Sequence, residues 1–249
     1  MDKLSSRDKS VLAGLYLSKF DVDGMDTLGF DSFTEAFNVI GLALDVRPAS
    51  IKNYRDEFDP LFPNSRKGWH KRPMRDYCKA IYDSFNHLPI DTFTQLLKEF
   101  IYKNHAVDVL LEEVSKKEEG EEQSFAKRLI TGQAAEQYFR SKFRGIPIFS
   151  ECAIEDTTKL GCGFDFRLVA SNEYYGVEVK GLNEANGSVM LTDKEHRVAT
   201  LLRSRYFLFV VKNFRDTPSH DMFRDPLSGP LTFKRLAIEK VSVNWVTNI

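Results

Sequence analysis

Apolar residues recur at intervals of three and four positions in the first half of the chain, and this spacing predicts amphipathic helices. One such stretch runs from Asp8 to Phe20 and a second from Ser32 to Leu44. Ser32 is followed three residues later by Glu35, which is the sequence signature of a capping box at the start of a helix. The chain is therefore expected to begin with helices that each bury one face.

Further helices are predicted downstream in the first half. Pro48 suits the first turn of a helix, because the missing amide hydrogen costs nothing there. Ile51, Tyr54 and Phe58 then lie on one face of that helix. The same periodicity predicts two more helices, over Tyr77–Phe85 and Asp91–Tyr102. The first half is therefore expected to be helical throughout.

The pattern changes in the second half, where helices alternate with strands. Ser124–Phe143 has amphipathic spacing, and Thr192 with Glu195 caps a second helix that runs to about Arg203. Short apolar runs predict strands over Ile148–Ile154, Gly163–Val169, Tyr175–Val179 and Tyr206–Val211, with one more over Leu231–Ile238. This alternation is typical of an α/β fold, a sheet flanked by helices.

The charged segment EEVSKKEEGEEQS, residues 112–124, separates the two halves. It contains a glycine and no aromatic residue, which is typical of a linker. A solvated helix start is the alternative, since the segment leads into a helical pattern. In either case we expect a helical domain over residues 1–111 and an α/β domain over residues 125–249.

Composition and charge narrow the class of protein. The 249 residues are 42% hydrophobic and 29% charged, as in an ordinary globular protein. With a net charge of −1, any nucleic-acid binding has to come from local basic patches. The three cysteines are odd in number and widely spaced, which argues against a disulfide framework and favours a reducing cytoplasm, and their lack of CxxC spacing argues against a zinc site. No apolar run is long enough for a transmembrane helix and no signal peptide is apparent, so we expect a cytoplasmic protein.

Residues 161–181, GCGFDFRLVASNEYYGVEVKG, hold the densest candidate chemistry. They predict a hairpin with either a two-residue loop at residues 171–172 or a four-residue loop over 171–174. Asp165 is opposite Glu178 with the shorter loop and opposite Lys180 with the longer one. In either register these three residues share one sheet face, because side chains alternate along a strand. Val177 and Val179 then point to the core.

Two carboxylates so close together repel each other, which raises a pKa or attracts a cation. Mg2+ prefers carboxylate oxygens and is the expected ion. The alternative is structural, because Glu-x-Lys is a common surface pattern and an isolated Asp165 would be solvated. However, Asp165 lies between two phenylalanines after a Gly-x-Gly, and the flanks of Glu178 and Lys180 have a buried pattern. These features favour a functional site.

Five segments in this half, taken in order, resemble a known superfamily of nucleases. They are GQAAEQYF, GCGFDF, GVEVKG, LTDKEH and YFLFVV, spread over Ser124–Phe214. Together they resemble the PD-(D/E)XK nuclease superfamily and, more narrowly, a small nuclease domain found at the C-terminus of restriction-related proteins. The resemblance implies a restriction-endonuclease-like mixed sheet between helices that cleaves phosphodiesters with Mg2+.

The resemblance also implies a role for each matching residue. Asp165 and Glu178, with the carbonyl of Val179, would hold Mg2+, and Lys180 would lie beside the scissile phosphate. Glu136 matches the acidic residue on the helix before the sheet and would reach the metal through a water molecule or complete a second metal site. The literal motif has proline before the aspartate, and this chain has phenylalanine there. A solvated helix carboxylate is the alternative for Glu136.

The first half has a separate signal for DNA recognition. SFTEAFNVIGLALDVRPASIKNYRDEF resembles a helix-turn-helix, with the connection near Ala43–Arg47. The start of the second helix in such a motif enters the major groove. Its candidate contacts with bases or phosphates are Ser50, Lys52, Asn53 and Arg55. The alternative is a generic helical bundle with one polar helix.

A basic cluster with an embedded aromatic residue follows directly. SRKGWHKRPMR contains the candidate DNA contacts Arg66, Lys67, Trp69, Lys71 and Arg72. Such a cluster fits backbone contacts combined with stacking on the indole. A solvated basic loop is the alternative. Because the cluster adjoins the helix-turn-helix pattern, DNA binding explains the two features together.

These patterns predict a Mg2+-dependent DNA endonuclease, most concretely a sequence-specific type II restriction endonuclease. With one active site per chain, we expect a homodimer to cut both strands of double-stranded DNA. Nucleases for repair, for particular DNA structures or for modified bases are alternatives within the same chemistry. A DNA-binding module without catalysis is the alternative from another class.

Overall fold

The computed structural model describes residues 4–69, 71–101, 119–158, 160–171 and 173–236. The first half is helical, as its periodicity predicts. Its helices are α1 (Ser6–Lys19), α2 (Asp21–Thr27), α3 (Phe33–Ala43), α4 (Pro48–Phe58), α5 (Asp76–Phe85) and α6 (Ile90–Ile101), with a 3-10 turn at Asp59–Leu61. Pro48 occupies the first turn of α4, and Ile51 and Phe58 are buried on one face. Helix α2 was not predicted, because its sequence DVDGMDT has no helical apolar stripe.

The capping box predicted at α3 forms in one direction only. The Ser32 side chain accepts a hydrogen bond from the Glu35 amide, as the pattern predicts. The Glu35 carboxylate, however, accepts from the Asp31 amide rather than from the Ser32 amide. The Glu35 carboxylate therefore binds the backbone amide one residue before the one that a capping box uses.

The second half is an α/β unit with a mixed five-stranded sheet, which confirms the expected fold class. The strands are β1 (Ala153–Asp156), β2 (Phe166–Val169), β3 (Tyr174–Gly181), β4 (Tyr206–Lys212) and β5 (Ser219–Arg224), and the helices are α8 (Glu119–Lys142) and α9 (Asp193–Leu202). Short 3-10 turns lie at Phe143–Gly145, Pro147–Phe149 and Arg203–Arg205. The strands are arranged in sequence order, and the β3–β4 pair alone is parallel.

Two strand predictions need correction. The segment predicted as a strand over Ile148–Ile154 is a 3-10 turn at Pro147–Phe149, and β1 starts only at Ala153. Residues 231–236 form neither helix nor strand, and 237–238 lie outside the described residues. The last described strand is β5, an edge strand whose sequence SHDMFR is mostly exposed and so lacks an apolar run.

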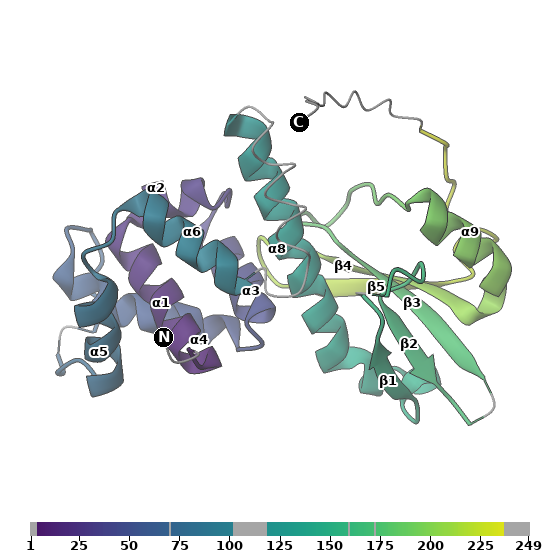
Figure 1. Cartoon of the computed structure of the whole chain (residues 1–249), viewed down its shortest axis with the longest axis horizontal. Coiled ribbons are helices and arrows are strands. Elements are labelled where there is room, and N and C mark those ends of the chain that lie inside the picture. Colours follow the sequence, from purple (N-terminus) through teal and green to yellow (C-terminus); the bar gives the residue numbers. More distant parts are fainter. Residues whose placement is uncertain (1–3, 70, 102–118, 159, 172, 237–249) are drawn as a thin grey trace, which may run out of the picture.

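The sheet is covered by α8 on one face and by α9 on the other (Figure 1). Phe139 of α8 packs against Phe166 and Phe209, with ring centroids 5.2 Å and 4.9 Å apart. On the opposite face, Leu202 of α9 and Tyr206 belong to a smaller buried cluster. Of the charged segment, residues 119–124 are part of α8, and residues 112–118 lie outside the described part of the chain.

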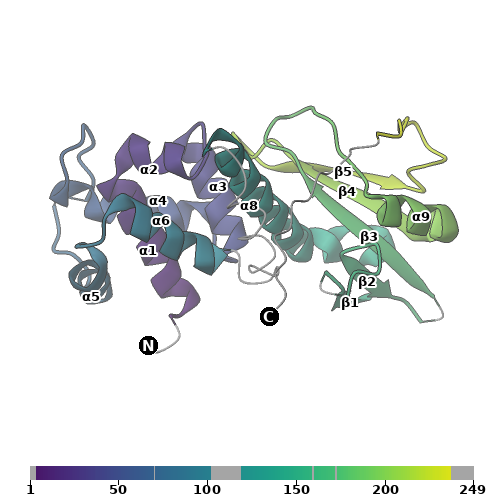
Figure 2. The same cartoon turned by 45° about the horizontal axis from the view of Figure 1, so that its top comes forward.

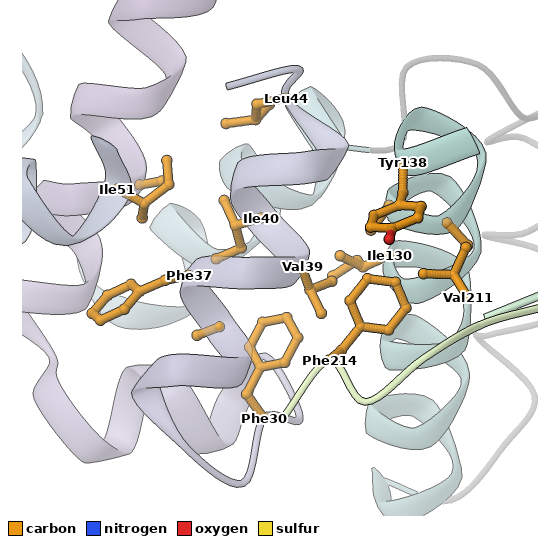
Figure 3. Packing of buried hydrophobic residues seen from close by; sticks show 14 of the residues in the cluster. Phe30, Phe37, Val39, Ile40, Leu44, Ile51, Ile130, Tyr138, Val211 and Phe214 are labelled. Atoms are coloured by element: carbon orange, nitrogen blue, oxygen red, sulfur yellow. The ribbon is translucent and has the colours of Figure 1, made fainter. Parts of the chain in front are cut away.

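Helix α8 also contacts the first half of the chain, and in both views it lies between the helices and the sheet (Figures 1 and 2). Phe214, in the loop after β4, points into the space between α3 and α8, beside Val39 and Ile130 (Figure 3). All three residues are fully buried, and one continuous apolar core contains them. The Asn38 amide donates to the carbonyls of Phe214 at 2.8 Å and Asp216 at 2.7 Å.

None of the described helices is both long and apolar enough to cross a membrane.

The shared core predicts that the two halves unfold together. Phe214→Ala should lower the free energy of unfolding by about 3–5 kcal/mol, because truncation leaves a cavity between α3 and α8. Leu201→Ala is the control, since Leu201 is 78% exposed and should change stability little. Denaturant titration followed by tryptophan fluorescence and by circular dichroism measures both variants. Two separate transitions in the wild-type protein would show that the core is not shared.

Candidate active site

The hairpin has the register of the shorter predicted loop. Phe166 pairs with Val177, and Val169 pairs with Tyr174. The Ala170 amide donates to the Glu173 carbonyl at 2.9 Å, which closes the turn. The longer-loop register, with Asp165 opposite Lys180, is therefore excluded. Val177 and Val179 are buried in the core on the α8 side, as predicted.

Asp165 lies where the regular ladder between β2 and β3 ends. Its amide donates to the Val177 carbonyl at 3.0 Å, one residue before the Glu178 partner that the register alone would give. This offset resembles a β-bulge, which redirects a side chain. The Asp165 carboxylate then accepts a hydrogen bond from the Val179 amide at 2.8 Å. The side chain is thus held against the edge of β3.

Glu178 and Lys180 project from β3 on the face opposite α8. Glu178 is 3% exposed, and its carboxylate oxygen lies 2.6 Å from the Lys180 ammonium nitrogen. The same nitrogen lies 2.9 Å from a carboxylate oxygen of Glu195, at the start of α9. The sequence predicts Glu195 as the capping partner of Thr192, and the structure confirms that role. Its contact with Lys180 was not predicted, because the two residues are separated by a loop.

Glu136 approaches the site from α8. It is partly buried, and the negative charges of Asp165 and Asp156 act on it along with the positive charges of Arg140 and Lys180. Arg140, one turn further along α8, forms an ion pair with Asp156 at the end of β1. The structure therefore brings the four predicted catalytic residues close enough together for their charges to shift one another's pKa values.

Burial and mutual repulsion raise the pKa values of the three carboxyl groups at the site. Burial, together with the charges of Asp165 and Asp156, raises the pKa of Glu136 to about 8. Burial, and then the charge of Asp165, raises the pKa of Glu178. Burial also raises the pKa of Asp165, although the hydrogen bond from Val179 opposes it. Three acids that resist ionisation in this way mark a place where a positive charge would be stabilising.

Lys180 remains an ammonium in this environment. Burial lowers its pKa, but Glu178 and Glu195 outweigh that effect and leave the pKa above its ordinary value. Its positive charge is therefore available at neutral pH.

Close packing at two glycines positions β3 and the loop before β2, which carry these residues. A side chain at Gly181 would lie 2.8 Å from the Thr131 carbonyl oxygen, so the end of β3 touches the backbone of α8. A side chain at Gly163 would lie 2.7 Å from Val198 of α9. Gly132 of α8 has open space around it, whereas the Ala135 side chain would lie 3.3 Å from a side chain at Gly181.

The donor atoms suit a hard divalent cation in kind. Asp165 and Glu178 supply carboxylate oxygens, and the Val179 carbonyl points to the same side of β3 as the Val179 amide that Asp165 binds. Among the described residues, no three histidine, cysteine, aspartate or glutamate side chains form a ready cluster for a metal ion. Binding an ion here requires Glu178 to give up part of its contact with Lys180.

The candidate DNA contacts on α4 divide into two groups. Lys52 and Asn53 are exposed, and Ser50 is half-buried. Arg55 is buried, and its guanidinium lies over the rings of Phe33 and Phe37 at 4.9 Å and 4.8 Å. The Arg55 side chain therefore packs α4 against α3 in this structure, and its contact with DNA stays a prediction.

Two arginines of the basic cluster after α4 form ion pairs with buried carboxylates of the same helical half. Arg66 forms an ion pair with buried Asp59 at 2.9 Å, and Arg72 with buried Glu57 at 3.2 Å. The Arg72 guanidinium also lies 4.3 Å from the centre of the Trp69 ring, which is half-buried. Lys67 and Lys71 are exposed and remain the candidates for phosphate contacts.

The raised pKa of Glu136 predicts how stability depends on pH without metal. An acid whose pKa rises from 4.5 to about 8 on folding costs stability once the pH exceeds 4.5, and the cost is complete above 8. Glu136→Gln should therefore stabilise the protein in EDTA by about 1–3 kcal/mol at pH 8.5 and by almost nothing at pH 4.5. Thermal unfolding at both pH values measures the difference, with the exposed carboxylate variant Glu151→Gln as control. Equal shifts at both pH values would contradict the electrostatic cause.

The candidate site lies within a segment of the chain that matches a known protein family. Residues 133–223 match the family described as Protein NO VEIN, C-terminal. The matched segment begins within α8 and extends into β5, so it contains Glu136, Asp165, Glu178 and Lys180. No curated protein and no solved structure was found to match the chain. The second half of this chain is thus similar to that family, and the helices before residue 133 lie outside the match.

Proposed function

We propose that this protein is a Mg2+-dependent DNA endonuclease of the PD-(D/E)XK superfamily. The observation that carries the proposal is the convergence of Asp165, Glu178 and Lys180 at one end of the β2–β3 ladder. Glu178 is buried and Asp165 is half-buried, both carboxyl groups have raised pKa values, and the lysine keeps its charge. Buried carboxylates with shifted pKa values beside a fixed ammonium are typical of functional sites rather than of solvated surfaces.

The proposed roles follow from the position of each group. Asp165, Glu178 and the Val179 carbonyl would hold Mg2+, and the ion would supply positive charge against the phosphate and make a bound water more acidic. Lys180 orients the scissile phosphate and offsets the charge that develops in the transition state. Glu136 approaches the same site from α8 and adds negative charge that favours binding of the cation.

We propose double-stranded DNA as the substrate because exposed polar and basic residues lie on the helical half. The exposed residues are Lys52 and Asn53 on α4 and Lys67 and Lys71 in the segment after it. Arg55 and Arg66 instead form ion pairs with the buried carboxylate of Asp59. The concrete version is a sequence-specific type II restriction endonuclease that cuts as a homodimer, since each chain has one proposed site. The three free thiols fit a cytoplasmic location.

Plasmid cleavage tests the catalytic part of the proposal. The wild-type protein should cut supercoiled DNA with Mg2+ and be inactive in EDTA. Asp165→Asn and Lys180→Met should each lower the rate by about 10²-fold or more, because each removes a charge that acts on the reacting phosphate. Gel electrophoresis of the products measures the rate, and Glu151→Gln is the surface control.

The products separate the alternatives. Discrete fragments support a site-specific restriction enzyme, and a smear supports a nonspecific one. Cleavage of methylated, damaged or branched DNA alone points to a modification-dependent, repair or structure-selective nuclease. If every DNA is bound but none is cut, the proposed chemistry is wrong and the protein is a DNA-binding module.

DNA binding tests the helical half separately. Lys71→Ala should weaken binding to a DNA duplex and reduce the dependence of log Kd on log salt by about one unit, because one phosphate contact is lost. Lys79→Ala on α5 is the matched control, since Lys79 is exposed and lies outside the proposed surface. Fluorescence anisotropy over a salt series measures both variants. If the two lysine variants behave alike, the cluster after α4 is not the DNA contact.

A further inference from the structure

The Lys180 ammonium has two carboxylate partners from different elements. Glu178, two residues earlier on β3, lies 2.6 Å from it, and Glu195, at the start of α9, lies 2.9 Å from it. Lys180 is half-buried, with 22% of its side chain exposed. A buried ammonium needs such partners, and two of them hold it more firmly than one.

Glu195 is itself fixed in place by the cap of α9. The Glu195 oxygen that binds Lys180 also accepts a hydrogen bond from the Thr192 amide at 2.9 Å. The Glu195 amide donates in return to the Thr192 hydroxyl at 3.2 Å. One turn of helix therefore presents this carboxylate to Lys180 in a defined direction.

Helix α9 also contacts the loop between β1 and β2, which leads into Asp165. The Lys194 ammonium donates to the Gly161 carbonyl at 2.7 Å. Val198 packs so close to Gly163 that a side chain there would be 2.7 Å away. Glu195 is thus positioned by the same helix that packs against the Asp165 side of the hairpin.

The two partners of Lys180 differ in what a metal ion would do to them. In the proposed nuclease Glu178 binds the cation, so its charge is shared with the ion and its hold on Lys180 weakens. Glu195 is a partner on a different element and keeps its full charge for Lys180. We propose that Glu195 is a positioning residue, which holds the Lys180 ammonium at the scissile phosphate once Glu178 has bound the metal. This inference rests on the proposed nuclease function.

Two crossed substitutions separate positioning from helix capping. Glu195→Gln keeps an oxygen for the Thr192 amide but removes the charge that holds Lys180. Thr192→Ala removes the capping hydroxyl and leaves that charge and the backbone amide in place. We expect Glu195→Gln to lower the single-turnover cleavage rate by about 10²-fold at saturating Mg2+ and DNA, with Kd for DNA unchanged. Thr192→Ala should cleave near the wild-type rate. A Glu195→Gln rate equal to that of wild type, or an equal loss in both variants, would overturn the proposal.

A double-mutant cycle gives a readout that does not depend on cleavage. The unfolding midpoint is measured for wild type, Lys180→Met, Glu195→Gln and the double variant, in EDTA and in Mg2+. We expect the double variant to lose less than the sum of the single losses in both conditions. The matching cycle of Lys180→Met with Glu178→Gln should show coupling in EDTA that shrinks in Mg2+. Additive losses for Lys180 and Glu195 in Mg2+ would contradict the inference.

The two experiments also distinguish this inference from the proposed function. If the wild-type protein cuts no DNA, the nuclease proposal fails, and the cycle still reports whether Glu195 holds Lys180 when Mg2+ is present. If the protein cuts DNA and the cycle is additive in Mg2+, the nuclease stands and the role of Glu195 is overturned.

Discussion

The arrangement of the whole chain depends on the buried contact between α3 and α8 that Phe214 completes. Helix α8 uses one side to cover the sheet and another to receive α3, so two halves with different periodicities share one core. The Asn38 amide binds the backbone on both sides of Arg215, which fixes the loop that carries Phe214. Because α8 also carries Glu136, this packing helps to place a candidate catalytic side chain.

Apolar packing around the site holds its carboxylates close together despite the repulsion between their negative charges. The charge of Asp165 raises the pKa of both Glu178 and Glu136, and burial raises the pKa of all three, so without a cation their ionised forms are disfavoured. Apolar contacts elsewhere, such as Phe139 against Phe166 and Phe209, keep the strands together despite this cost. Such a balance is typical of sites where function, rather than stability, selects the residues.

Much of the site was predictable because it depends on local rules. The alternation of side chains placed Val177 and Val179 in the core, and the Thr192 cap followed from its spacing to Glu195. Other features depend on contacts distant in sequence and left no local signal. The Glu195–Lys180 ion pair crosses a loop, the burial of Arg55 depends on α3, and β5 is an exposed edge strand without an apolar run.

The shared core has a consequence for where a nuclease of this kind would cut. In many two-domain enzymes a flexible tether lets the cleaving part reach a range of positions beside the recognised bases. Here α3 is packed directly on α8, which in turn packs on the sheet that carries Lys180. If the protein is the proposed nuclease and α4 contacts the bases, the distance along the DNA between those bases and the hydrolysed phosphate would be the same from one DNA molecule to the next.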